Sequence, residues 1–237
     1  MNNIFSKTET PKTIGIIMDG NRRWAKSKNL PAHEGHTAGY EKLKDFARWA
    51  KEAGVKNVIA FAFSTENWER KKHEVDFLLM LFRKMVIEEA EELKKEKARI
   101  IFLGDLDKFP RDIVVAARKL EEDTKKYAKN QTIGLAVSYG GRAEIISAVK
   151  KLVKEKGVQA VNKLNEKMFS NCLFTKDIPD PDLIIRTSGE MRLSGFLTWQ
   201  SVYSELFFTK TNWPALTKKE FYKILKEYVS RERRLGK

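Results

Sequence analysis

The chain has 237 residues, of which 42% are hydrophobic and 33% are charged, and its formal net charge is +14. This apolar content excludes a disordered chain, and the length indicates one domain with its own core. The single cysteine, Cys172, excludes an internal disulfide bond, and we find no signal peptide and no membrane-spanning stretch. We therefore expect a soluble, cytoplasmic protein whose positive charge favours anionic partners.

Six short apolar segments alternate with helical patterns along the chain. Most of them are continuously hydrophobic, which is typical of strands covered on both faces of a sheet. The predicted strands are residues 14–18, 58–63, 99–103, 132–137, 183–186 and 203–208. Because strands that alternate with helices favour parallel pairing, we predict a mainly parallel sheet.

Helical periodicity lies between these strands. The predicted helices are residues 40–53, 75–93 and 113–127. A last helix is predicted to begin at a capping box formed by Thr217 and Glu220. Gly54 is a candidate left-handed cap, and residues 158–181 are expected to be a connection without elements of its own. The predicted fold class is a single α/β domain over residues 13–237, after a tail of residues 1–12, with helices flanking a six-stranded, mainly parallel sheet.

Polar clusters follow four of the predicted strands, at residues 19–24, 64–70, 138–142 and 186–194. Each cluster combines arginine with glycine, serine, threonine or asparagine. In an open parallel sheet, ligands bind beyond the carboxyl ends of the strands. The clusters therefore predict a phosphate-binding rim at one end of the sheet.

Two of these clusters leave alternatives open. Gly20 and Asn21 can present backbone amides to an anion at a helix start, or Asp19 can simply cap that helix. Arg186 and Arg192 can hold a pyrophosphate or form structural ion pairs. Glu205 lies in an apolar setting, where it is either a paired core glutamate or a partner of Asp19 in holding Mg²⁺.

The predicted helix 75–93 carries a second apolar surface of Phe77, Met80 and Leu81. Packing on two sides explains this surface, and so does the wall of a cavity for a long hydrocarbon chain. A phosphate rim above such a cavity indicates an amphiphilic substrate with a pyrophosphate head. The chain contains no Walker loop, dinucleotide fingerprint or nucleophile elbow, and no pattern predicts a nucleic-acid partner.

Several motifs then occur in a recognisable order. They are Asp19-Gly20-Asn21-x-Arg23-Trp24-Ala25, Gly35-His36, Phe63-Ser64-x-Glu66-Asn67-Trp68-x-Arg70, Tyr139-Gly140-Gly141-Arg142, Ile185-Arg186-Thr187-x-Gly189-Glu190, Arg192-x-Ser194 and Trp199-Gln200. From about residue 13 to residue 236 the chain resembles the cis-prenyltransferases, isoprenyl diphosphate synthases of the undecaprenyl diphosphate synthase type. The resemblance implies repeated addition of isopentenyl diphosphate to an allylic diphosphate, such as farnesyl diphosphate, with Mg²⁺ as cofactor. It implies an apolar tunnel that opens at the carboxyl ends of the strands.

The resemblance also implies roles for particular residues. Asp19 would be the catalytic carboxylate and a magnesium ligand, Asn67 would assist proton removal, and Glu205 would complete the metal site. The substrate-binding residues would be Gly20, Asn21, Arg22, Arg23, Trp24, His36, Ser64, Thr65, Glu66, Trp68, Arg70, Arg186, Arg192, Leu193 and Ser194.

Further expectations concern product and partners. The product would be a Z-polyprenyl diphosphate, a precursor of a cell-wall or glycan lipid carrier, released with peripheral membrane contact. We expect a homodimer, in which Arg234-Leu235-Gly236 reaches the neighbour's site. The alternative is a non-catalytic partner subunit of the same fold. Phe82 and Leu103 are expected near the tunnel floor.

The chain departs from the family pattern at three positions. Ala32 stands where the family commonly has arginine, Ser138 where it has asparagine, and Met191 where it frequently has histidine or asparagine. Lys28 and Arg22 are the candidates for supplying the missing phosphate contact.

Overall fold

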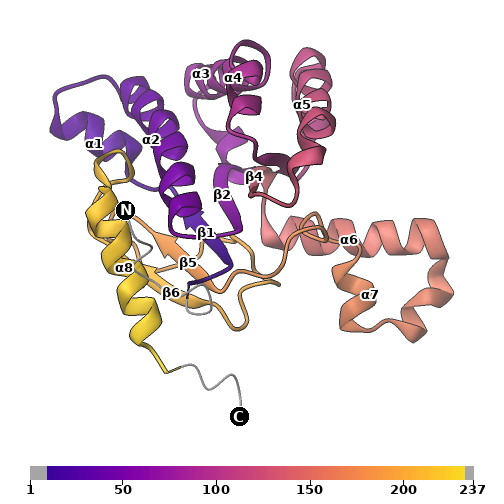
Figure 1. The fold of residues 1–237 in the computed structure, drawn as a ribbon. Coiled ribbons are helices and arrows are strands. Elements are labelled where there is room, and N and C mark those ends of the chain that lie inside the picture. Colours follow the sequence, from indigo (N-terminus) through magenta and orange to yellow (C-terminus); the bar gives the residue numbers. More distant parts are fainter. Residues whose placement is uncertain (1–9, 233–237) are drawn as a thin grey trace.

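A computed structural model describes residues 10–232 of the chain. Its centre is one sheet in which the strands follow the order β3-β4-β2-β1-β5-β6, and every neighbouring pair is parallel (Figure 1). The strands are β1 (Thr13–Ile17), β2 (Asn57–Ser64), β3 (Arg99–Leu103), β4 (Thr132–Tyr139), β5 (Leu183–Arg186) and β6 (Glu205–Phe208). The predicted α/β domain with six strands is confirmed, and the sheet is wholly parallel.

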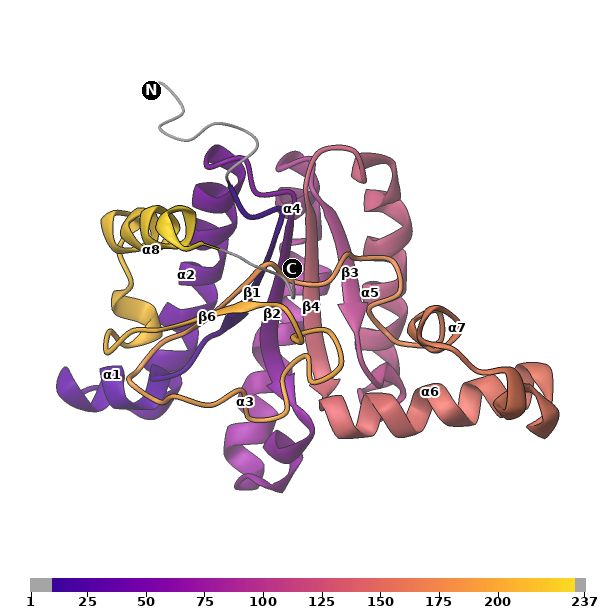
Figure 2. The same ribbon diagram turned by 90° about the horizontal axis from the view of Figure 1, so that it is seen from below.

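Helices cover the two faces of the sheet unequally. The helices are α1 (Asn21–Ser27), α2 (Ala32–Glu52), α3 (Lys72–Arg83), α4 (Ala90–Lys95), α5 (Arg111–Thr124), α6 (Gly141–Lys156), α7 (Glu166–Ser170) and α8 (Lys218–Ser230). The largest apolar core joins one face of the sheet to α2, α3, α5 and α8. The loops before and after β5 cross the other face, and α6 extends away from the sheet (Figures 1 and 2).

The prediction of one continuous helix over residues 75–93 is wrong. After α3 the backbone makes a π-helical turn, Lys84–Glu88 (η2), before the short helix α4 begins. An inserted π turn keeps the apolar spacing helical on both sides, so periodicity alone does not reveal it.

The helix predicted over 40–53 begins eight residues earlier, at Ala32. Gly35 and Gly39 carry no apolar signal, yet both face α1, where a β-carbon at either position would collide with atoms of Asn21. Glycine is therefore required for close packing of the two helices rather than for a turn.

Of the other predicted features, the caps at Thr217 and Gly54 are confirmed and the connection over residues 158–181 is wrong. Thr217 caps α8 as predicted, and Gly54 has the left-handed φ of +89°. Residues 158–181 are not free of elements, because they contain α7 and a 3-10 helix, Val158–Lys163 (η5). Within residues 10–232, no helix is long and apolar enough to cross a membrane.

Strand register decides which polar residues can meet. Ile17 at the end of β1 is level with Arg186 at the end of β5, so Asp19 and Arg186 emerge at the same edge. Glu205 instead pairs with Leu183, at the amino ends of β6 and β5. Glu205 therefore lies at the other end of the sheet from Asp19.

Candidate active site

A polar cavity of about 420 Å³ opens at the carboxyl ends of the central strands. Nearly all of its lining is made of residues that the sequence singled out. They are Asp19, Gly20, Asn21, Arg22, Arg23, His36, Arg70 and Arg192, together with Met18. The segment after β1, the start of α2 and two later loops thus bring their charged groups to one place.

Asp19 is held between two arginines. Its Oδ2 accepts a hydrogen bond of 3.0 Å from Arg186 Nη2, and its Oδ1 lies 3.1 Å from Arg23 Nη2. Burial alone would raise the pKa of Asp19, but the hydrogen bond and charge of Arg186, with those of Arg23, outweigh it and lower that pKa. The carboxylate is therefore ionised at neutral pH.

Arg186 connects the carboxylate to the loop that follows β5. It is only 5% exposed, and its Nη1 donates to the Arg192 carbonyl oxygen at 2.5 Å and to Ser194 Oγ at 2.8 Å. Its buried Nε has no hydrogen-bond partner. Three of its five N–H groups are thus engaged, which leaves the Nε–H and one Nη2–H for an anionic ligand.

Two further carboxylates, Glu190 and Glu74, hold the other arginines, and the sequence patterns gave neither of them a role. Glu190 lies 3.1 Å from Arg23 and 2.5 Å from Arg192. Glu74 lies 2.7 Å from Arg70 and 3.6 Å from Arg22. The i,i+4 spacing of Arg70 and Glu74 across the start of α3 was the available signal.

His36 adds an uncharged ring to this rim. Its Nε2 is buried without a hydrogen-bond partner, 3.4 Å from Glu74 Oε1. Burial lowers the pKa of His36, and the charges of Arg70 and Arg22 act in the same direction, against Glu74. A neutral imidazole that carries its proton on Nε2 can donate a hydrogen bond to an anion that enters the cavity.

The loop after β2 lies beside this cavity and is internally bonded. Asn67 Oδ1 accepts from the Ser64 amide at 3.0 Å, while the Ser64 side chain accepts from the Asn67 amide, a capping box for the 3-10 helix Thr65–Glu69 (η1). Thr65 donates to Glu66 at 3.0 Å. Of this loop, Arg70 lines the polar cavity, whereas Asn67 is engaged in holding the loop.

Trp68 ties the loop to the end of β4. Its indole nitrogen donates to Ser138 Oγ at 3.0 Å, and its ring packs on Phe63 and Phe109. Ser138 is 2% exposed and has a φ of +46°, which is strained for a residue with a β-carbon. The serine at this departure from the family pattern therefore has a defined contact.

We expect Ser138→Ala to lower the kcat/KM of the reaction at this site about tenfold. The half-buried indole of Trp68 loses its hydrogen-bond acceptor, and the loop after β2 loses its bond to β4. Steady-state kinetics and thermal unfolding measure the two effects separately. Ser170→Ala is the matched control, since it removes the same kind of bond, 3.2 Å long, from Trp199 far from the cavity. Equal losses of activity in both variants would contradict a local role for Ser138.

Ten predicted site residues do not line the polar cavity. They are Trp24, Ser64, Thr65, Glu66, Asn67, Trp68, Arg186, Leu193, Ser194 and Glu205. Trp24 is half-buried in α1, and Leu193 packs against the core of the second sheet face. Glu205 bonds Arg231 at 2.7 Å, so it is a paired glutamate at the far end of the sheet. The predicted sharing of one ion by Asp19 and Glu205 of the same chain is therefore corrected by the strand register. No cluster of three potential metal-binding His, Cys, Asp or Glu side chains occurs in residues 10–232.

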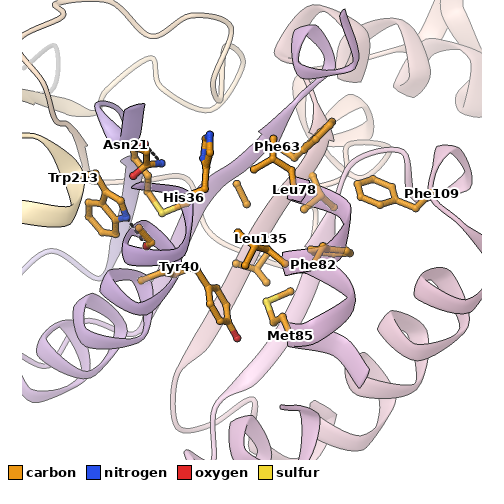
Figure 3. Close-up of a pocket in the computed structure, with 16 residues that line it drawn as sticks. Asn21, His36, Tyr40, Phe63, Leu78, Phe82, Met85, Phe109, Leu135 and Trp213 are labelled. Atoms are coloured by element: carbon orange, nitrogen blue, oxygen red, sulfur yellow. Dashed lines mark hydrogen bonds between the residues drawn. The ribbon is translucent and has the colours of Figure 1, made fainter. Parts of the chain in front are cut away.

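An apolar cavity of about 100 Å³ adjoins the polar one between α2 and α3, and shares Met18, Asn21 and His36 with it (Figure 3). Its remaining lining is almost entirely apolar. It consists of Gly39, Tyr40, Leu43, Ala62, Phe63, Leu78, Leu81, Phe82, Met85, Phe109, Leu135, Val137 and Trp213.

A second apolar cavity, of about 80 Å³, lies next to the first on the side of α4. Phe82 lines the first cavity as expected. Leu103 does not line either, because it points to the opposite face of the sheet. Of the second apolar surface expected on α3, only Leu81 lines the first cavity, and Met80 is exposed.

Comparisons with known proteins agree with this geometry. Residues 17–236 match the family model for undecaprenyl diphosphate synthases, Prenyltransf. The chain belongs to this family. It is thus an enzyme of the isoprenyl diphosphate synthase type, a transferase.

Individual relatives cover almost the whole chain. An isoprenyl transferase of Thermotoga maritima is 46% identical over 95% of this chain and 97% of its own. A geranylgeranyl-diphosphate-specific tritrans,polycis-undecaprenyl-diphosphate synthase of Picrophilus torridus is 44% identical over 98% and 92%. The structure of lavandulyl diphosphate synthase from Lavandula x intermedia, in complex with dimethylallyl diphosphate, has a TM-score of 0.90, 32% identity and coverage of 97% and 100%. A probable undecaprenyl diphosphate synthase of Campylobacter jejuni has a TM-score of 0.79, 35% identity and coverage of 96% and 99%.

Two further expectations from the resemblance concern the contact missing at Ala32 and the C-terminal Arg234-Leu235-Gly236. Arg22 lines the polar cavity and Lys28 does not, so Arg22 is the better candidate for the contact missing at Ala32. Arg234-Leu235-Gly236 lies outside the described residues.

Proposed function

We propose that the protein is a Mg²⁺-dependent cis-prenyltransferase that adds isopentenyl diphosphate repeatedly to an allylic diphosphate. The observation that carries this proposal is the junction of two cavities, one lined by arginines and one by apolar side chains, at Met18, Asn21 and His36. A diphosphate bound in the first places its hydrocarbon chain toward the second. The product would be a Z-polyprenyl diphosphate, the precursor of a cell-wall or glycan lipid carrier.

The charge balance of the rim suits a diphosphate. Five arginines (22, 23, 70, 186 and 192) face three carboxylates (Asp19, Glu74 and Glu190), which leaves two excess positive charges. Arginines already held in place by carboxylates need little reorganisation when charge develops on a leaving diphosphate. In this proposal Arg22, Arg23 and His36 bind the allylic head, and Arg186, Arg192 and Ser194 bind the five-carbon diphosphate.

The donors present fit Mg²⁺. Magnesium takes oxygen ligands and is commonly bound by one or two carboxylates with substrate phosphates and water, and Asp19 is the carboxylate that lines the polar cavity. When bound, the ion would neutralise charge on the diphosphate oxygens. Asp19 would hold it with the carboxylate oxygens that Arg186 and Arg23 now contact.

The apolar walls protect the reacting carbon. As the allylic C–O bond breaks, the electron pair leaves with the diphosphate and the allylic carbon gains positive character. The double bond of isopentenyl diphosphate attacks this carbon, and loss of a proton completes the new Z double bond. Exclusion of water by the apolar cavity prevents hydrolysis. The assignment of proton removal to Asn67 is supported by the family resemblance alone, because Asn67 Oδ1 holds the Ser64 amide.

The decisive experiment incubates the purified protein with Mg²⁺, farnesyl diphosphate and labelled isopentenyl diphosphate, and separates the products by chromatography. Chain extension that EDTA abolishes supports the proposal. Absence of extension with farnesyl, geranyl and geranylgeranyl diphosphates would leave the alternative, a non-catalytic partner subunit. The intact Asp19–Arg186 pair favours the enzyme.

The proposal includes assembly and membrane contact. Exposed apolar side chains on α6 and the segment after it (Ile146, Val149, Val158 and Val161) support a homodimer through this surface. Sedimentation analysis of the purified protein tests whether it forms this homodimer. The net charge of +14 supports peripheral contact with an anionic membrane from the cytoplasmic side during product release.

We expect Phe82→Trp to shorten the products by about one isoprenoid unit, because a larger ring fills part of a cavity of about 100 Å³. Chromatography of dephosphorylated products measures the length. Phe174→Trp is the matched control, since Phe174 is half-buried against the second sheet face. An unchanged length with Phe82→Trp would place the growing chain elsewhere.

A further inference from the structure

The two apolar cavities are separated by a wall of four residues that line both of them. These residues are Tyr40, Leu43, Met85 and Leu135. Figure 3 shows Tyr40 and Met85 facing each other across the lower end of the first cavity. Leu43, Met85 and Leu135 are held by packing, whereas Tyr40 also carries a hydroxyl group that can be bonded.

The Tyr40 hydroxyl is held by an ionised carboxylate. It donates to Glu89 Oε2 at 2.5 Å, and Lys44 Nζ donates to the same oxygen at 3.0 Å. Lys84 lies 3.2 Å from the other oxygen of Glu89. The Lys44 ammonium also lies 4.8 Å from the centre of the Tyr40 ring. Charge-assisted bonds of this kind fix the ring more firmly than packing alone fixes its apolar neighbours.

The π turn brings Glu89 to this position. Its amide donates to the Lys84 carbonyl oxygen at 2.9 Å, which closes the i→i+5 ring of η2. Each helical residue turns the chain by about 100°, so an uninterrupted helix would direct Glu89 away from Tyr40. π turns are uncommon and occur frequently at functional sites. The π turn thus places Glu89 where it accepts the hydrogen bond from the Tyr40 hydroxyl.

We propose that Tyr40 and Glu89 form a clasp that determines product length, an inference that rests on the proposed function. A hydrocarbon chain that has filled the first cavity meets the Tyr40 ring. It reaches the second cavity only when the bond to Glu89 breaks and the ring turns aside. The clasp thereby favours release of the product over further extension.

The test compares Tyr40→Phe and Glu89→Gln, which keep side-chain size and weaken or remove the bond. Each variant receives Mg²⁺, farnesyl diphosphate and labelled isopentenyl diphosphate, and products are separated by length. We expect the ratio of longer to shorter products to rise about tenfold in each variant, and the double variant to add little to either. The control is Asp112→Asn, which weakens the Arg83–Asp112 pair between α3 and α5 by removing its negative charge. Neither Arg83 nor Asp112 lines an apolar cavity.

The possible outcomes distinguish a clasp at Tyr40 from a general effect on α3. Unchanged product lengths in active, folded Tyr40→Phe protein would overturn the proposal, and so would an equal shift in Asp112→Asn, which would indicate general loosening of α3. Tyr40→Phe carries the test if Glu89→Gln proves unstable in thermal unfolding. Absence of any extension by the unaltered protein would instead refute the proposed function, a different result from a change in length.

Discussion

We expect Asp19→Asn to lower kcat by about 1000-fold or more and to leave the fold intact. The substitution removes the negative charge that lines the polar cavity and keeps a side-chain oxygen to accept from Arg186 at the present 3.0 Å contact. Single-turnover kinetics at saturating Mg²⁺ measure the loss, and circular dichroism reports the fold. A variant with a near-normal rate would refute the site.

The structure changes the choice of substitution at this position. From the sequence, Asp19→Ala is expected to remove a metal ligand and to spare the fold. Arg186, however, is 5% exposed and has Asp19 as its counter-ion. Alanine, unlike asparagine, removes the oxygen that accepts the hydrogen bond from this buried guanidinium as well as the negative charge. We expect Asp19→Ala to lower the free energy of unfolding by about 2 kcal/mol, in addition to abolishing turnover.

The stability difference depends on pH in a defined direction. Because the pKa of Asp19 is lower in the folded state than its usual 3.8, the carboxylate stabilises the fold above about pH 4. This contribution is lost as the pH falls through the lowered value. The stabilities of the unaltered protein and Asp19→Ala should therefore begin to converge as the pH falls below about 4 and should meet below the lowered pKa. A constant difference would contradict the ion pair.

Under the proposed function, we expect Arg186→Lys to raise the KM for isopentenyl diphosphate about 100-fold and to change the KM for the allylic substrate much less. Lysine keeps the charge but lacks the planar set of donors that now reaches Asp19, the Arg192 carbonyl and Ser194. Initial-rate kinetics with each substrate varied in turn measure the two constants.

The control for this prediction is Arg83→Lys. Arg83 makes a two-pronged pair with Asp112 at the protein surface, so the substitution repeats the chemical change away from the cavity. We expect no change in either KM. A similar rise in both constants for Arg186→Lys would show that it supports the whole site rather than the five-carbon subsite.

Local patterns predicted the elements well where burial is continuous. The strands that end in Ile17 and Arg186 are short apolar runs between turn residues, and they are found where the sequence indicated. Local patterns failed at the start of α2, where Gly35 is selected by contact with α1, and at the π turn after α3. The glycine at position 35 and the π turn both depend on contacts with residues that are remote in the sequence.

By itself the sequence determined the sheet, the edge at which ligands bind and most of the rim, because parallel strands gather the residues after each of them at one end. Only the tertiary structure decided which charges meet. The register of β6 separates Glu205 from Asp19, Glu74 and Glu190 become the partners of the rim arginines, and the wall at Tyr40 divides the apolar space. These contacts depend on strand order and helix approach, which arise from packing of the whole chain and leave no local pattern.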